Sequence, residues 1–105
     1  MAPKAGVEGL ARSAAVTYAN AGIRINVVAP GLVKSEMSRK IWDNEPAAAA
    51  LREMHALGKL GEPRDVASLI VWLIDPANDW ITGQIIGIDG GLSSVLQRQR
   101  TSLQR

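Results

Sequence analysis

Cysteine is absent from this chain of 105 residues. Its absence excludes a disulfide framework and catalysis by a thiolate, and it weighs slightly towards a reducing, cytosolic environment. The chain also has a single histidine, so no second imidazole or thiolate can complete a typical transition-metal site. We therefore expect no bound metal ion.

Long hydrophobic runs and blocks of like charge are missing as well. No apolar run approaches the roughly 20 residues of a membrane span, and Met1 is not followed by a basic and then apolar signal segment. The formal net charge is +2, and charges of both signs are interspersed. Such a pattern does not favour a nucleic-acid surface. We expect a cytoplasmic protein that binds neither membranes nor nucleic acid.

What the chain does contain is a strand-length apolar run that stops at a Pro-Gly step. The run from Ile25 to Ala29 is nearly all apolar, which favours a strand buried on both faces of a parallel sheet. Pro30 cannot donate to a ladder and Gly31 accepts any backbone angle, so the strand should end there. Because ligands in open α/β sheets lie beyond the carboxyl ends of the strands, we expect a binding loop from Pro30 to Met37.

Helical patterns lie on both sides of this strand. Apolar residues at helical spacing predict a helix from about Pro3 to Ala21, which Gly22 should close in a left-handed conformation. The pair Asn44 and Pro46 is typical of a cap and a first turn, and it predicts a short helix from Pro46 to His55. A further helix is expected from Arg64 to Ile74, because Asp75 precedes a proline.

A second buried strand is predicted from Gln84 to Ile88, followed by a turn at Asp89, Gly90 and Gly91. Two strands that are apolar on both faces need neighbours and helical cover that this chain cannot supply alone. The fold class is therefore α/β, with part of a doubly wound parallel sheet that is incomplete on its own. We expect residues 1–94 to belong to this folded portion and residues 95–105, rich in Arg and Gln, to form a solvated tail.

Five short motifs together resemble the C-terminal part of the short-chain dehydrogenase/reductase family, whose sheet is Rossmann-like. They occur in the family's order and at similar spacings, from Lys4 to about Ser93. The motifs are Lys4-Ala5-Gly6-Val7-Glu8-Gly9-Leu10, the strand from Gly22 to Gly31, Gly58-Lys59-Leu60-Gly61-Glu62-Pro63, Thr82-Gly83-Gln84 and Asp89-Gly90-Gly91.

The resemblance implies a nicotinamide-dependent oxidoreductase that acts on an alcohol or carbonyl substrate, with NAD or NADP as cofactor. Lys4 would be the lysine of the family's catalytic Tyr-x-x-x-Lys pair, which tunes the tyrosine and holds the nicotinamide ribose. Its tyrosine would precede Met1. The catalytic serine and the Gly-rich cofactor loop are likewise not in this sequence, so the bound cofactor is expected only if the N-terminal part is present.

The resemblance also assigns residues after the strand. Pro30 and Gly31 would approach the cofactor, Val33 would bind the carboxamide through its backbone N–H and C=O, and Ser35 would bind it through its hydroxyl. Met37 and Trp42 would belong to a lid over the substrate. Independently of the resemblance, the helix Arg64–Ile74 is apolar around most of its surface, so it must be covered on two sides, by its own sheet and by a partner subunit or a missing part of the fold. We expect this helix and the last strand to join subunits of a homo-oligomer.

Two hypotheses remain open for this chain. In the first, Met1 is an internal residue of a full-length enzyme and the chain is its C-terminal portion. In the second, the short chain is the genuine product and acts as a non-catalytic interaction or oligomerisation protein derived from that family. Whether the chain is an enzyme is therefore left undecided, and we expect no dehydrogenase activity from these 105 residues alone.

Several residues have simpler interpretations. Arg24 and Asn26 are expected to make structural hydrogen bonds. We interpret His55 as an ordinary residue of a loop or helix surface, because it has no convincing carboxylate partner. Trp80 is expected in the core, and Trp72 is equally consistent with core packing and with a subunit interface.

Overall fold

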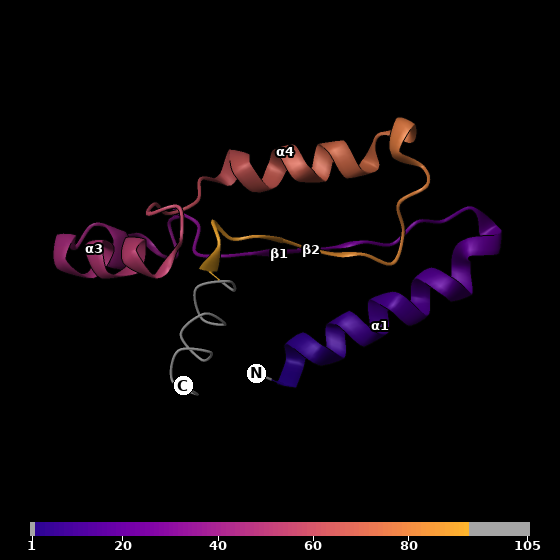
Figure 1. The fold of residues 1–105 in the computed structure, drawn as a ribbon, viewed down its shortest axis with the longest axis horizontal. Coiled ribbons are helices and arrows are strands. Elements are labelled where there is room, and N and C mark those ends of the chain that lie inside the picture. The colour runs from indigo at the N-terminus through magenta and orange to yellow at the C-terminus, as the bar shows by residue number, and fades with distance from the viewer. Residues whose placement is uncertain (1, 93–105) are drawn as a thin grey trace, which may run out of the picture. The chain divides into compact units, whose positions relative to one another are not determined.

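The structure is a computed structural model that describes residues 2–92, with side chains from residue 5 onward. The predicted tail at 95–105 and the side chain of Lys4 therefore lie outside the described residues. The described chain is an α/β protein, as predicted, with a parallel sheet of two neighbouring strands (Figure 1). Its elements follow one another in the order α1 (Ala2–Tyr18), η1 (Ala19–Ala21), β1 (Val27–Pro30), α2 (Arg39–Trp42), α3 (Glu45–Met54), α4 (Pro63–Ile74), η2 (Pro76–Asn78) and β2 (Ile85–Ile88).

The residues group into two compact units, which we describe one at a time. The first unit contains residues 2–29 and 67–87, and the second contains residues 30–66 and 88–92. The strands and α4 each contribute residues to both units.

The first unit begins with the predicted long helix. Its last turn tightens into the 3₁₀ segment η1, and Gly22 closes it with φ of 75°, a left-handed conformation that glycine adopts without steric cost. Among the side chains of α1 that the structure describes, those of Ala11 and Ala15 are buried. A Cβ on Gly83 would lie 3.6 Å from the Ala15 side chain, so the turn before β2 packs closely on this helix.

Two polar side chains fix the approach to β1 in the first unit. The Arg24 guanidinium donates to the carbonyl oxygens of Leu73 at 2.8 Å and Ile81 at 3.1 Å. The Asn26 side chain donates to the Ile81 oxygen and accepts from the Gln84 N–H, both at 3.1 Å. The structural role predicted for both residues is confirmed.

The second unit contains the helices α2 and α3 and the loops around them. The Asn44 side chain accepts from the Ala47 N–H at 3.3 Å and caps α3, and Pro46 lies in the first turn, as the sequence indicates. The four-residue helix α2 was not predicted. Ala48 and Leu60 are the buried apolar residues of this unit.

The strands remain incompletely covered. No residue of β1 or β2 is fully buried, although both strands are almost entirely apolar. The exposed large side chains of α4 include Val71, Trp72 and Ile74. The prediction that the sheet is incomplete is therefore confirmed.

The expected core position of Trp80 is wrong, because its side chain is 97% exposed. It follows η2 in a turn, where no described side chain packs over the indole. None of the described helices is long and apolar enough to cross a membrane.

Candidate functional site

The loop that follows β1 pairs almost every backbone donor it has. Four of the five amides from Gly31 to Ser35 donate hydrogen bonds, to the Ile88 oxygen, the His55 ring, the Gly61 oxygen and the Ser38 hydroxyl in turn. The Val33 N–H is the exception, since it has no partner among the described residues. One donor is thus left available in a loop that is otherwise fixed.

Gly61 holds one edge of this loop. Its N–H donates to the Leu32 oxygen at 2.9 Å, and its oxygen accepts from the Lys34 N–H at 2.9 Å, which makes an isolated parallel bridge opposite Val33. A Cβ on Gly61 would lie 3.3 Å from a Val33 methyl group. The predicted motif around Gly61 therefore supports the loop after β1 directly.

Gly31 is required by close packing in the same unit. A Cβ at this position would lie 2.9 Å from both Cα and Cβ of Asp89, closer than real Cβ contacts come. The Gly31 N–H donates to the Ile88 oxygen at 3.1 Å, which extends the strand pairing by one residue beyond Pro30. The Pro-Gly step is thus explained by its contact with the turn after β2.

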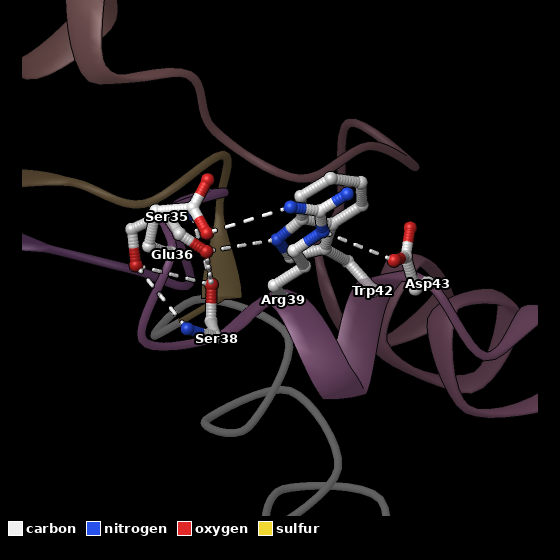
Figure 2. Close-up of polar contacts among 6 residues, drawn as sticks. All are labelled: Ser35, Glu36, Ser38, Arg39, Trp42 and Asp43. Atoms are coloured by element: carbon white, nitrogen blue, oxygen red, sulfur yellow. Dashed lines mark hydrogen bonds and ion pairs between the residues drawn. The ribbon is translucent and has the colours of Figure 1, made fainter.

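Ser38 forms several hydrogen bonds in the turn that begins at Ser35 (Figure 2). Its hydroxyl donates to the Val33 oxygen at 2.9 Å, accepts from the Ser35 N–H at 3.0 Å and lies 3.2 Å from the Ser35 hydroxyl. The Val33 carbonyl, expected to bind a carboxamide, is therefore already hydrogen-bonded, although its second lone pair can still accept. Sequence reasoning missed Ser38; the available signal was a second serine three residues after Ser35, since serine side chains bond readily to nearby backbone groups.

Trp42 points back from α2 to the same turn (Figure 2). Its indole N–H donates to the Ser35 carbonyl oxygen at 3.1 Å. The Lys34 ammonium lies 5.9 Å from the centroid of the Trp42 ring, within reach of a cation–π attraction, and 3.5 Å from the Glu62 carboxylate. Trp42 therefore supports Ser35 in the described structure.

The charged side chains near this turn are mostly exposed. Arg39 lies 3.6 Å from the Glu36 carboxylate and 3.3 Å from that of Asp43. Such surface pairs contribute about 0–1 kcal/mol each, so the turn depends on its hydrogen bonds more than on its ion pairs. Met37, the other predicted lid residue, projects into solvent with 98% exposure.

The interpretation of His55 as a surface residue is wrong, because its side chain is only 4% exposed. Its Nδ1 lies 2.7 Å from the Leu51 carbonyl oxygen, and its Nε2 accepts from the Leu32 N–H at 3.4 Å. Both partners are backbone groups, which residue spacing alone cannot reveal. His55 also lines a hollow of about 200 Å³ together with Leu32, Leu60 and Asp89.

The backbone polar groups of Val33 and the Ser35 hydroxyl fit the polar end of a planar amide such as a carboxamide. The free Val33 N–H can donate to its oxygen, while the Val33 carbonyl and the exposed Ser35 hydroxyl can accept from its NH₂ group. The structure places Gly31, Val33 and Ser35 in the loop directly after β1, and Pro30 is the last residue of that strand. Lys4 lies at the start of α1, in the other unit.

Among the described residues, no cluster of three or more potential ligands could hold a metal ion.

Comparison with known proteins gives matches over most of the chain. The family model described as "Enoyl-(Acyl carrier protein) reductase" matches residues 1–93. A chloroplastic tropinone reductase homologue of Arabidopsis thaliana is 41% identical over 90 residues, covering 86% of this chain and 28% of its own. The 3-oxoacyl-[acyl-carrier-protein] reductase of Vibrio harveyi is 39% identical over 94 residues, covering 90% and 38%. The chain thus spans about a third of the length of these relatives.

Solved structures with bound cofactor match as well. 4-Hydroxyisoleucine dehydrogenase complexed with NADH aligns with a TM-score of 0.84 and 29% identity, over 89% of this chain and 38% of that one. A 2-deoxy-D-gluconate 3-dehydrogenase from Agrobacterium tumefaciens, described as putative and holding NADP, aligns with a TM-score of 0.81 and 31% identity, again over 89% and 38%.

Proposed function

The chain belongs to the short-chain dehydrogenase/reductase family, and from this premise we propose that it is the C-terminal portion of an NAD(P)-dependent oxidoreductase. The reaction is the transfer of a hydride between the nicotinamide and an alcohol or carbonyl substrate. The relatives named above include reductases of oxo compounds and a dehydrogenase of a hydroxy compound, which supports this substrate class. The N-terminal portion of the same enzyme supplies the remaining site.

One observation supports the proposal: among the described residues the Val33 N–H has no partner, whereas the other backbone donors from Gly31 to Ser35 are all engaged. Val33 is only partly exposed, and a donor without a partner costs on the order of 1–3 kcal/mol where water cannot reach it. A carboxamide oxygen at that position would recover this free energy. Specific recognition is favoured because the rest of the loop is held before the ligand arrives.

The residues of this chain then have distinct tasks. Val33 and the Ser35 hydroxyl orient the carboxamide, and Gly31 allows the loop to pack against Asp89. The Lys4 ammonium holds the ribose hydroxyls and stabilises the ionised form of the family's tyrosine. The cofactor supplies the hydride when it is bound. Met37, at the end of this loop, and Trp42, on α2, form part of the cover over the substrate.

We also propose that α4 contributes to a homo-oligomer interface. Its side chains Val71, Trp72 and Ile74 are 63%, 49% and 69% exposed, and neighbouring exposed apolar side chains often mark a protein–protein contact. If Trp72→Asp leaves the oligomer mass unchanged while the protein stays folded, this interface does not exist.

The test of function uses the protein as it is produced in its native source, with its intact mass measured first. We expect a species at least twice the 11.2 kDa of this chain, which oxidises NADH or NADPH when small ketones and 3-oxoacyl thioesters are supplied. Lys4→Met should reduce kcat/KM by about 100-fold or more, as losses of transition-state electrostatic groups do.

The matched control is Arg12→Met, which removes an exposed positive charge from the same helix. It should leave kcat/KM within about twofold of the parent, as surface substitutions usually do. A native species of 11.2 kDa that neither binds nor oxidises a nicotinamide nucleotide would refute the proposal and favour an interaction protein.

A further inference from the structure

His55 is the one buried polar side chain of the described chain, and the proposed reaction gives it no role. It follows the last residue of α3 and faces two segments of the second unit. Gly90 packs on it, since a Cβ there would lie 3.7 Å from the His55 Cβ. The ring is thus fixed by packing as well as by hydrogen bonds.

The two partners of the ring select one tautomer. The Leu51 carbonyl oxygen can only accept, so Nδ1 must carry a hydrogen. The Leu32 N–H can only donate, so Nε2 must present its lone pair. The two contacts therefore select the tautomer with its hydrogen on Nδ1, and both ring nitrogens are used.

Each nitrogen has a separate consequence. The bond to Leu51 satisfies one of the carbonyl groups that the last turn of any helix leaves without a partner, so Nδ1 caps α3. The bond to Leu32 acts on the binding loop, because Leu32 directly precedes the unpaired Val33 N–H. At 3.4 Å this bond is long, and a small shift of the loop would break it.

We propose that His55 is a positioning residue, which holds Leu32 through Nε2 and thereby aims the Val33 N–H at the nicotinamide carboxamide. The backbone of Gly61 is hydrogen-bonded to the Leu32 oxygen and to the Lys34 N–H. The His55 ring accepts a hydrogen bond from the Leu32 N–H. With both contacts in place, the peptide between Leu32 and Val33 cannot rotate freely. The part that concerns the nicotinamide rests on the function proposed above.

Two substitutions separate the loop contact from the helix cap. In His55→Asn the side-chain amide can take the place of Nδ1 and keep the bond to Leu51, but it is too short to reach Leu32. In His55→Gln the amide oxygen can take the place of Nε2 and accept from the Leu32 N–H. Asn44→Ala is the matched control, because it removes the cap at the other end of α3 and leaves the loop unchanged.

The experiment measures NADH and NADPH dissociation constants of the native protein by cofactor fluorescence, together with kcat. We expect His55→Asn to weaken binding roughly three- to tenfold, the range of one hydrogen bond, with kcat nearly unchanged. The dissociation constants of His55→Gln should lie within about twofold of those of the parent. All three variants, including Asn44→Ala, should have a lower melting temperature. Equal dissociation constants for the Asn and Gln variants would overturn the proposal.

Two measurements by NMR test the contact without any cofactor. The ring ¹⁵N shifts should show the hydrogen on Nδ1, and the Leu32 amide should exchange faster in His55→Asn than in His55→Gln. Hydrogen on Nε2, or identical Leu32 exchange in the two variants, would also overturn the proposal. If the parent protein binds no nicotinamide nucleotide, the proposed function fails, whereas the contact with Leu32 is still decided by these two measurements.

Discussion

Gly31→Ala should destabilise the protein because the position has no room for a methyl group. The added Cβ would lie 2.9 Å from Cα and Cβ of Asp89 and 3.1 Å from its carbonyl oxygen. Two of these three atoms belong to the backbone, so a change of rotamer cannot relieve the overlap. Ordinary contact begins near 3.4 Å, which means that the loop or the turn must move by about half an ångström.

That movement also stretches the hydrogen bond from the Gly31 N–H to the Ile88 oxygen, which is already 3.1 Å long. Overpacking costs about 1–3 kcal/mol and a weakened backbone hydrogen bond about 1 kcal/mol, so we expect a loss of about 2–4 kcal/mol in the free energy of unfolding. Urea denaturation followed by circular dichroism measures it.

Gly9→Ala is the control, since a Cβ at Gly9 meets nothing within 4 Å. Gly9 lies inside α1, where alanine is better than glycine by about 0.5–1 kcal/mol, so this variant should gain stability. If both substitutions change the free energy of unfolding in the same direction, the packing argument at Gly31 is refuted.

Three further substitutions test the contacts that hold the loops. Ser38→Ala leaves the Ser35 N–H unpaired and should cost about 1–2 kcal/mol in urea denaturation, whereas Ser38→Thr keeps the hydroxyl and most of the stability. Trp42→Phe removes the indole donor to the Ser35 oxygen but keeps a ring, so the Ser35 turn should exchange its amides faster while unfolding changes by only about 1 kcal/mol. Arg24→Met removes two bonds to carbonyl oxygens and should cost about 2–3 kcal/mol, and a loss no larger than that of the exposed Arg12→Met would contradict this expectation.

The regular elements could be predicted from the sequence because their signals are local. Gly22 closes α1 in the left-handed conformation expected of it, and Asn44 caps α3 through its own side chain. Both outcomes depend on residues within a few positions of one another. Helical spacing of apolar residues likewise predicted α1, the residue before Pro76 predicted the end of α4, and apolar runs that end at turn residues predicted the two strands, all to within a few residues.

The remaining features depend on contacts that a linear pattern does not contain. The helix α2 has four residues, too few for a periodicity, and it follows a turn whose hydroxyl contacts define it. His55 was misread because its partners are the backbone groups of Leu51 and Leu32, the second of them 23 residues away. Trp80 was misread because residue type indicates only average burial, and a turn can expose any side chain.

The unpaired Val33 N–H is more informative than the exposed Ser35 hydroxyl as evidence for a ligand. A surface serine is common and well hydrated, and it fits any polar neighbour. The Val33 N–H lies instead between backbone amides that all have partners. Those partners come from four places: β2, the end of α3, Gly61, and Ser38. A single water molecule could satisfy that donor, but it would not require the peptide on either side to be fixed. Fixed peptides cost conformational entropy, and they are useful when the direction of the free donor matters, as it does for a planar acceptor that must be held at one angle.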